Sequence, residues 1–406
     1  MESINPKDHR KVSWSELPPD LLISIIERLD PQYDIFNLRR VCKAWKTTVS
    51  LTLVSKNILS PLIPQCLPFD EATTTEFSVV MGSVIQIQSL ANPNLPPCLL
   101  TVTEINSGKL FIRPPLFKRT ATRLHSDHDP HILPEDFPHV LDLSRFRVSE
   151  LGRFHSKIRK IKSKPNKLVR FKAVLIKDPN CENWATTINN YTLVEMSRTQ
   201  SLSATRLVAS NPETHDVIFE TKERIKFRNF VEFKGKIYAV DKVGMVYSMD
   251  YHTLKMSMIT KVDNFKNIYY LETKKYLVVS SSSELYLVCR RRTREVNSGT
   301  FSVFKLNEEK KKWDKITSIG DDKILFVTFD GCFFVLANDF PGWKGNCIVF
   351  HYDKYIRTLN KYVVGVFHLN SGDYGTLDSF PGYSNVLWPP PSWLWTDTCS
   401  STTGAD

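Results

Sequence analysis

The chain has 406 residues, of which 42% are hydrophobic and 24% are charged, and its formal net charge is +11 at pH 7. This length leaves room for a small module and one large or two ordinary domains. No apolar run approaches the roughly 18 residues that a membrane helix needs, and the first dozen residues are too polar for a secretory signal peptide. The sequence therefore predicts neither a membrane partner nor a secreted protein.

The cysteines agree with that expectation. None of them forms a Cys-x-x-Cys motif, and nothing else in the sequence indicates an oxidising compartment. We expect reduced, mostly buried thiols of an intracellular protein. Their positions are Cys42, Cys66, Cys98, Cys181, Cys289, Cys332, Cys347 and Cys399.

The first clear element is a helix near the N-terminus. Leu21, Ile25 and Leu29 recur every fourth position, which predicts a helix from about Pro18 to Leu29 with a broad apolar stripe. Proline suits a first helical turn because its missing N–H would have no partner there. Asp30-Pro31 then ends the helix.

Two shorter helices are predicted after it. One begins near Asp34, and the other carries Cys42, Trp45 and Val49 at helical spacing. Three short helices cannot bury so much apolar surface among themselves. Either the rest of the chain or another protein must cover the remainder.

A family resemblance favours another protein. The Leu-Pro pair before a Leu-Leu helix and the later Val-Cys-Lys-x-Trp run resemble an F-box, the three-helix module that binds the Skp adaptor of Skp–cullin–F-box ubiquitin ligases. The resemblance implies a polar tail at residues 1–12 and an F-box at residues 13–59, with its apolar stripe facing the adaptor. The implied adaptor-binding residues are Leu17, Pro18, Leu21, Leu22, Ile25, Leu29, Val41, Cys42 and Trp45, and Lys43 also matches the motif.

The remainder of the chain is predicted to be mainly β. Short apolar and aromatic runs are separated by turn residues, and three of them repeat one pattern: Val, an aromatic residue, any residue, Met or Leu, then Asp or Asn. These runs are Val246–Asp250, Val303–Asn307 and Val366–Asn370. Each is expected to be a strand that runs into a turn.

Around these runs the expected strands fall into sets of four, which is typical of β-propeller blades. We therefore predict a β-propeller-like domain after the F-box, and a β-sandwich is the alternative. The first set is Phe230–Phe233, Lys236–Val240, Gly244–Met249 and Leu254–Ile259. The second is Tyr276–Ser280, Glu284–Val288, Phe301–Leu306 and Trp313–Ile316, and the third is Ile324–Phe329, Cys332–Leu336, Cys347–Phe350 and Val363–Leu369.

A second resemblance covers most of the chain. Together with the F-box, the segments Leu141–Gly152, Asn346–Phe350 and Trp388–Trp395 resemble a group of plant F-box proteins whose C-terminal domain is often labelled kelch-like. The resemblance implies the substrate-recognition subunit of a ubiquitin ligase, without catalysis or a cofactor of its own. Residues 60–395 would bind a protein target, and residues 396–406 would be a disordered tail. The absence of a Gly-Gly pair weakens the kelch label.

One stretch departs from the β pattern. Residues Asp142–Ile161 place apolar side chains on one irregular helical face, which predicts a helix there. Nine Lys or Arg residues and no acidic residue lie between Arg153 and Lys172. Three explanations stay open for these charges: a nuclear-import signal, a patch for nucleic acid or an acidic partner, and a solvated linker or helix face. We expect the protein in the nucleus, the cytoplasm or both, and an import signal would favour the nucleus.

Two rival functions remain. A basic nucleic-acid-binding β protein would fit the charge, although no recognised nucleic-acid motif accompanies it. An enzyme of propeller architecture would need convergent polar groups in its central channel, and the sequence contains no familiar catalytic motif. His125–His131 holds three histidines and two aspartates, yet no matching second ligand pair follows, so no metal site is predicted.

The target-binding surface is expected in a loop. Residues Asp339–Gly345 place Phe340 and Trp343 between turn-forming proline and glycine residues, and aromatic side chains supply many interface hot spots. We predict that these two residues bind the target. Packing in the protein's own core is the competing explanation.

Overall fold

The computed structural model contains two compact units, residues 1–62 with 180–187, and residues 63–179 with 188–406. The second unit is called the β domain below. Among the described residues, no helix is long and apolar enough to span a membrane. The structure describes residues 17–28, 42, 44–45, 48, 75–106, 109–116, 133–138, 141, 145–161, 164–177, 191–197, 199–207, 213–216, 218–219, 225–250, 253–261, 273–280, 282–292, 299–328, 331–340, 342–356, 361–376 and 390–396.

The first unit contains helix α1, Pro19–Arg28. Its bounds confirm the predicted helix to within one residue at each end. Residues 44, 45 and 48 are also helical, as the Cys42-Trp45 spacing predicts. The helix predicted from Asp34 lies outside the described residues.

The N-terminal part of the β domain is one eight-stranded sheet with the order β3-β2-β1-β4-β5-β6-β7-β8. β4 and β5 form its central antiparallel pair, so the sheet divides there into two four-stranded halves. The strands are β1 Thr75–Ser89, β2 Cys98–Asn106, β3 Lys109–Arg113, β4 Phe146–Ile161, β5 Lys164–Lys177, β6 Tyr191–Met196, β7 Leu202–Leu207 and β8 Glu213–Asp216.

Three further sheets follow, with the orders β10-β11-β12-β13-β9, β14-β15-β16-β17 and β19-β18-β20-β21-β22. The strands of the first two are β9 Ile218–Phe219, β10 Phe227–Phe233, β11 Lys236–Asp241, β12 Met245–Met249, β13 Lys255–Lys261, β14 Thr273–Val279, β15 Leu285–Arg292, β16 Gly299–Asn307 and β17 Lys312–Ile316. Those of the last are β18 Lys323–Val327, β19 Cys332–Leu336, β20 Cys347–Ile356, β21 Lys361–His368 and β22 Tyr374–Thr376.

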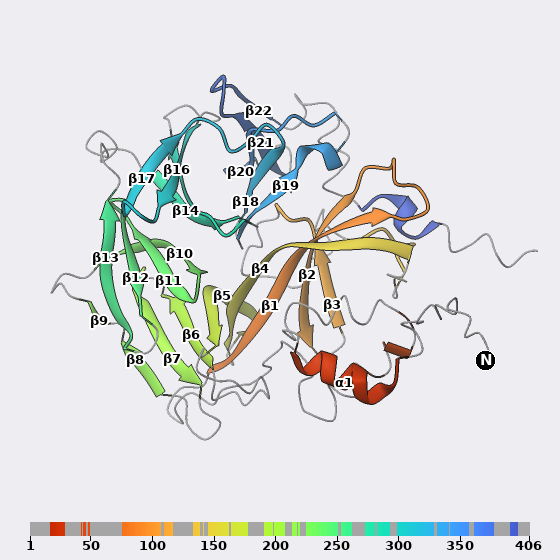
Figure 1. Cartoon of the computed structure of the whole chain (residues 1–406), viewed down its shortest axis with the longest axis horizontal. Helices are drawn as coiled ribbons and strands as arrows, with labels where there is room; N and C mark the ends of the chain where they lie inside the picture. Colours follow the sequence, from red (N-terminus) through yellow and green to blue (C-terminus); the bar gives the residue numbers. More distant parts are fainter. Residues whose placement is uncertain are drawn as a thin grey trace, which may run out of the picture. The chain divides into compact units, whose positions relative to one another are not determined.

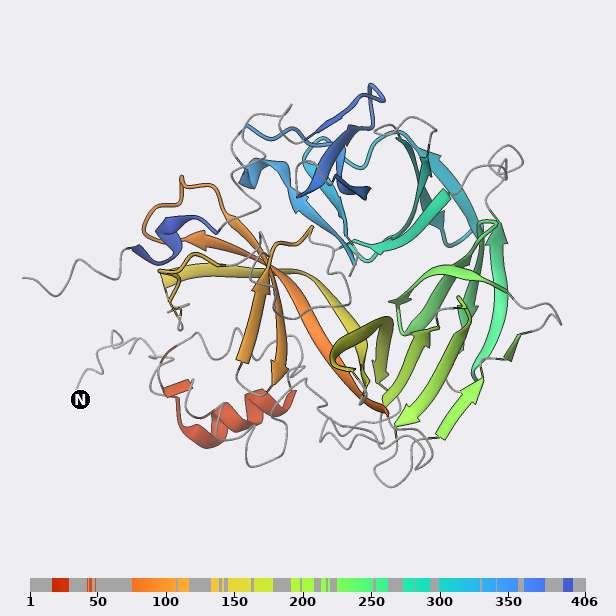
Figure 2. The same ribbon diagram turned by 180° about the vertical axis from the view of Figure 1, so that it is seen from behind.

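These sheets pack face to face around a closed ring (Figures 1 and 2). One apolar cluster joins β5–β7 to β10–β13, the next joins β10–β12 to β14–β17, and a third joins β14–β16 to β18–β21. A fourth joins β18–β21 back to β1, β2 and β4, which closes the ring. Closure distinguishes the fold from a β-sandwich, so the predicted propeller-like architecture is confirmed.

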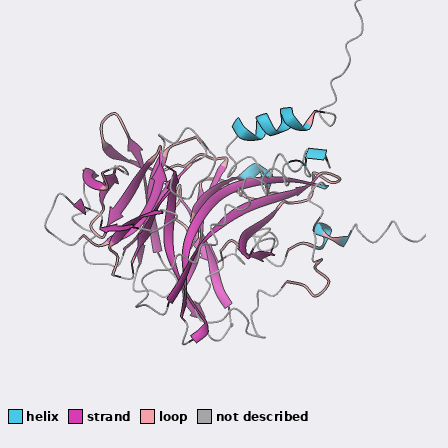
Figure 3. Cartoon of the chain, turned by 90° about the horizontal axis from the view of Figure 1, so that it is seen from below, coloured by secondary structure: helices cyan, strands magenta, loops and turns pink. Residues whose placement is uncertain are grey.

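The strands nearest the ring centre are β4, β5, β10, β14 and β19, each in contact with the next. The two halves of the first sheet and the three further sheets therefore make five blades in the described part of the chain. Figure 3 shows that strands make up most of the regular structure.

The first two predicted strand sets match two blades closely. Asp250 and Asn307 end their strands as expected, because each carboxylate or amide oxygen accepts a hydrogen bond from a backbone N–H three residues later, Thr253 at 2.9 Å and Lys310 at 3.0 Å. The third set differs in order. β18 pairs in parallel with β20 rather than following a simple meander, and β22 adds a fifth strand.

The predicted helix at Asp142–Ile161 is wrong, because Phe146–Ile161 is strand β4. Its apolar side chains join two clusters, one shared with strands β18–β21 and the other covered by the C-terminal segment. Phe146 joins the cluster that holds Trp395, while Phe154 joins the cluster that closes the ring. An apolar pattern of this kind is difficult to distinguish from a helical face by periodicity.

Two glycines of the first sheet lie close to aromatic side chains. A Cβ atom added to Gly82 on β1 would lie 2.2 Å from Cζ of Phe154, so the phenyl ring fills the space above the glycine. A Cβ on Gly152 of β4 would lie 3.1 Å from Cβ of Phe333 on β19. Gly82 and Phe154 are cross-strand partners within the first sheet, whereas the missing side chain of Gly152 lets the first blade approach the last.

The C-terminal segment packs on the first blade. The indole N–H of Trp395 donates a 2.9 Å hydrogen bond to Asp136, and its ring lies edge-on to Phe137 with centroids 5.1 Å apart. Leu394 and Trp395 are buried with residues of β1, β2 and β4. The segment is thus part of the β domain.

Candidate functional site

Helix α1 has a well-formed first turn. The Pro18 carbonyl accepts hydrogen bonds from the backbone N–H groups of Leu21 and Leu22, both at 3.1 Å. Asp20 lies in this turn, where its negative charge is favourable at the positive end of the helix dipole. The Leu17-Pro18 turn is therefore fixed against the start of the helix.

The predicted adaptor-binding residues divide into two groups by exposure. Leu21 is 55% exposed and Pro18 is exposed, while Leu17 and Ile25 are partly exposed. In contrast, Leu22 is 1% and Trp45 6% exposed. Cys42 is partly exposed, and its sulfur accepts a 3.4 Å hydrogen bond from the backbone N–H of Trp45. Leu29 and Val41 lie outside the described residues, as does Lys43.

This division refines the sequence prediction. Leu21 and Ile25 are four residues apart and share one face of α1, whereas Leu22 is turned by about 100° along a helix. The side chains on the Leu21 face are the ones that a partner can reach. Leu22 and Trp45 are already buried, so they can support that face without contacting a partner.

The described residues of the basic segment lie on strands β4 and β5, so they form neither a linker nor a helix face. Lys157 is buried, and its Nζ lies 2.8 Å from Oε1 of Glu195 on β6. Arg153 forms a two-bond pair with Glu150, at 2.9 and 2.6 Å. Part of the positive charge is thus neutralised within the domain.

A polar contact joins three inner strands. Lys172 of β5 donates a 3.0 Å hydrogen bond to Oδ1 of Asn229 on β10, and the same oxygen accepts the Leu277 backbone N–H of β14 at 3.4 Å. The Lys172 ammonium also lies 5.3 Å from the centre of the Phe230 ring. Sequence reasoning missed this contact, because nothing local marks Asn229 as a bridge.

Beside it lies a second basic group. Lys275 of β14 is buried and donates a 2.7 Å hydrogen bond to the Lys242 carbonyl. Burial lowers the pKa of Lys275, and the charges of Arg228 and Lys242 lower it further, against the opposing effects of Cys289 and Asp241. One Asp241 oxygen accepts three backbone N–H bonds, from Val243, Gly244 and Met245, at 2.7 to 2.8 Å.

The predicted target-binding aromatics are buried. Phe340 is 1% and Trp343 7% exposed, and both belong to the cluster that joins the first and last blades. Core packing therefore accounts for them. Their role in target binding stays a prediction, and it would require a rearrangement that exposes the rings.

The described cysteines are free thiols. Burial raises the pKa of Cys289 to about 12 and that of Cys332 to about 11, so both thiols stay protonated near neutral pH. Within the described residues, no three metal-ligating side chains come together. His125–His131 lies outside these residues.

Comparison with known proteins agrees with this architecture. The model described as F-box domain matches residues 14–57, and the model described as KIB1-4 beta-propeller matches residues 86–369. The chain belongs to the KIB1-4 beta-propeller family.

Relatives whose names contain the term F-box match most of this chain. The chain is 25% identical to the F-box protein SKIP23 of Arabidopsis thaliana, over 94% of this chain and 96% of that protein. It is 24% identical to the Arabidopsis thaliana F-box protein At2g17036, over 95% of each chain. It is also 24% identical to the putative F-box/kelch-repeat protein At5g24040 of the same plant, over 84% of this chain and 87% of that protein. The predicted resemblance to plant F-box proteins is confirmed.

Proposed function

We propose that this protein is the substrate-recognition subunit of a Skp–cullin–F-box ubiquitin ligase. The F-box binds the Skp adaptor, and the β domain binds a protein target. The single observation that carries the proposal is the exposed Leu21 beside the Pro18 turn, within the segment that matches the F-box.

The adaptor contact is an apolar one. Leu21 is exposed beside the exposed Pro18 and the partly exposed Leu17 and Ile25. Covering a Leu or Ile in a complex contributes about 1.5 to 3 kcal/mol. Leu17, Pro18, Leu21 and Ile25 form this contact, and Leu29 with Val41 extends it. Leu22 and Trp45 hold the helix in place from the buried side.

In this proposal the chain promotes ubiquitination by holding the target close to the ubiquitin-conjugating enzyme. The ubiquitin-conjugating enzyme belongs to other subunits, and the bound target is held where its lysines have a high local concentration. The chain itself then needs neither a catalytic residue nor a cofactor. A closed propeller suits this task, because its rigid blades hold the connecting loops in fixed positions.

Affinity purification tests the proposal. The tagged protein is purified from cells with the proteasome inhibited, in parallel with the variants Leu21→Glu and Leu90→Glu. Leu90 is a matched control, because it is 52% exposed like Leu21 but lies in the β domain. The wild type and Leu90→Glu should recover the adaptor and ubiquitinated targets, and Leu21→Glu should recover the targets without the adaptor.

Two outcomes would count against the proposal. Equal adaptor recovery with both variants would remove α1 from the contact. Recovery of nucleic acid instead of protein targets, with binding that falls steeply as salt rises, would favour the basic nucleic-acid-binding alternative.

A further inference from the structure

Strand β10 contains an irregularity at Arg228. Phe227 pairs with Asp241 and Asn229 pairs with Val240, so Arg228 is an extra residue without a partner on β11. Such bulges redirect a side chain and are common beside functional sites. The Arg228 Nε atom is buried and has no hydrogen-bond partner among the described residues. A buried guanidinium donor without an acceptor is costly, and the Arg228 Nε–H can donate a hydrogen bond to a ligand oxygen.

Other cations surround this position. Lys275 of β14 donates a hydrogen bond to the Lys242 carbonyl in the turn after β11, and Lys172 of β5 donates one to Asn229, the residue next to Arg228. The charges of Arg228 and Lys242 act together on Lys275, which places the three groups near one another. Three inner strands and one turn thus bring four positive side chains to one end of β10.

The nearby negative charge is already engaged. Asp241 is buried, and one oxygen accepts the backbone N–H groups of its own turn. Among the described groups that act on Lys275, Asp241 is the one carboxylate, beside the two cations Arg228 and Lys242. Lys242 is exposed, and Arg228 and Lys172 are partly exposed, so an anion can reach the group from solvent.

We propose that Arg228, Lys242 and Lys275, with Lys172 beside them, bind a phosphate group at the β10 bulge. A phosphate offers several oxygens to donors that converge from different strands, and Arg pairs with it through parallel N–H bonds. The group can come from a free phosphate compound or from a phosphorylated side chain of a protein. The proposal does not depend on the adaptor contact, since it concerns the β domain alone.

Binding measurements on the full chain test the site. Pyrophosphate and a short phosphoserine peptide are titrated calorimetrically at fixed ionic strength, with the unphosphorylated peptide as a blank. The variants are Arg228→Gln and Lys242→Gln. The control is Lys236→Gln, which removes an exposed charge at the other end of β11.

Binding of either probe that weakens at least tenfold in Arg228→Gln and Lys242→Gln, but not in Lys236→Gln, is the expected result. Tighter binding of the peptide would assign the phosphate to a protein, and tighter binding of pyrophosphate would assign it to a small compound. A loss of binding that is equal in all three variants would reduce the effect to net charge and overturn the site. Absence of binding to the wild type would overturn it as well. Thermal melts identify any unfolded variant, and Lys242→Gln decides the question if Arg228→Gln does not fold.

Discussion

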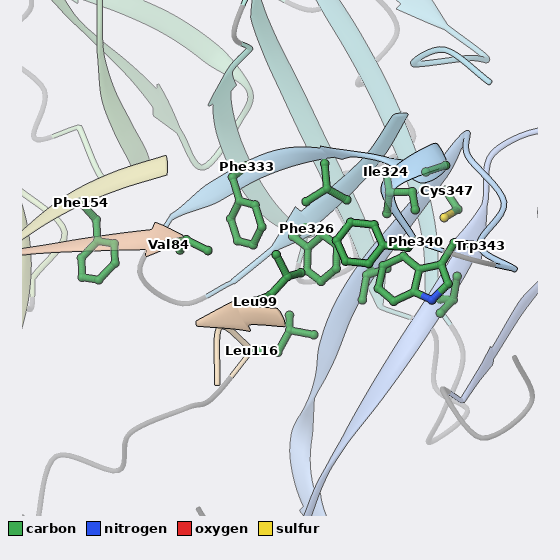
Figure 4. Packing of buried hydrophobic residues seen from close by; sticks show 14 residues of the cluster. Val84, Leu99, Leu116, Phe154, Ile324, Phe326, Phe333, Phe340, Trp343 and Cys347 are labelled. Carbon is green, nitrogen blue, oxygen red and sulfur yellow. The ribbon is translucent and has the colours of Figure 1, made fainter. Parts of the chain in front are cut away.

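Phe340 stacks on Trp343, with ring centroids 4.5 Å apart and an angle of 20° between the planes. Trp343 in turn stacks on Phe326 of β18 at 6.1 Å. Figure 4 shows these rings in the cluster that also contains Val84 and Leu99 of the first blade. The loop that joins β19 to β20 therefore helps to hold the two ends of the ring together.

Replacement of either ring should destabilise the β domain. Phe340→Ala and Trp343→Ala each remove a large buried side chain, and such changes cost about 3 to 5 kcal/mol of unfolding free energy. Urea denaturation followed by tryptophan fluorescence and circular dichroism measures the loss. Variants that stay as stable as the wild type while losing the target would instead make this pair the recognition surface.

Gly82 should tolerate no side chain while Phe154 is present. Gly82→Ala places Cβ 2.2 Å from Cζ of the Phe154 ring, and overpacking of this kind typically costs about 1 to 3 kcal/mol. Gly331→Ala is the matched control, because its Cβ would lie an ordinary 3.9 Å from Cβ of the same Phe154. The melting temperature should fall for Gly82→Ala and change little for Gly331→Ala. Equal shifts would show that the phenyl ring does not restrict Gly82.

The unfolding free energy of the β domain should fall in mild acid because of His155. Burial, and secondarily the charge of Arg153, lowers the pKa of His155 from 6.5 to about 4. Between these values the unfolded chain takes up a proton that the folded chain does not, so the unfolding free energy falls as the pH falls from 6.5 to about 4. The melting temperature of His155→Gln should depend less on pH in this window than that of the wild type. Parallel curves would contradict the depressed pKa.

Nuclear import by the basic segment stays a prediction, and the structure changes how it is tested. Lys157 is left in place because it is paired with Glu195. Arg159, Lys160, Lys162 and Lys164 are replaced by Gln, and a fluorescent fusion should then move from the nucleus to the cytoplasm. Replacement of the exposed lysines at 310–312 by Gln is the control. An unchanged distribution would leave these charges with a structural role only.

The blades from β10 to β17 could be predicted from the sequence because their signals are local. Alternating apolar residues mark the strands, and Gly235 with φ of 72° and Asp250 mark the turns. The order of the last sheet could not be predicted. β18 pairs in parallel with β20, although β19 lies between them in the sequence. Such pairing depends on tertiary packing rather than on neighbours in the sequence.

The candidate sites show the same limit. The apolar stripe of α1 was visible in the spacing of Leu21 and Ile25, but which leucine is exposed depends on the packing of the unit. The cations around Arg228 come from β5, β10, β14 and one turn, so no sequence window contains them. Only the bulge at Arg228 brings this position to notice, and a bulge has no reliable sequence signal here.

Direct binding between the purified chain and the Skp adaptor tests the central claim. Calorimetry compares the wild type with the double variant Leu17→Ala and Pro18→Ala, after circular dichroism has shown that the β domain of the variant is folded. We expect a one-to-one complex with the wild type and a loss of binding of at least tenfold in the variant, since each lost apolar contact is worth more than the roughly 1.4 kcal/mol that changes affinity tenfold. Failure of the wild type to bind, or undiminished binding by the variant, would contradict the proposed contact between this F-box and the adaptor.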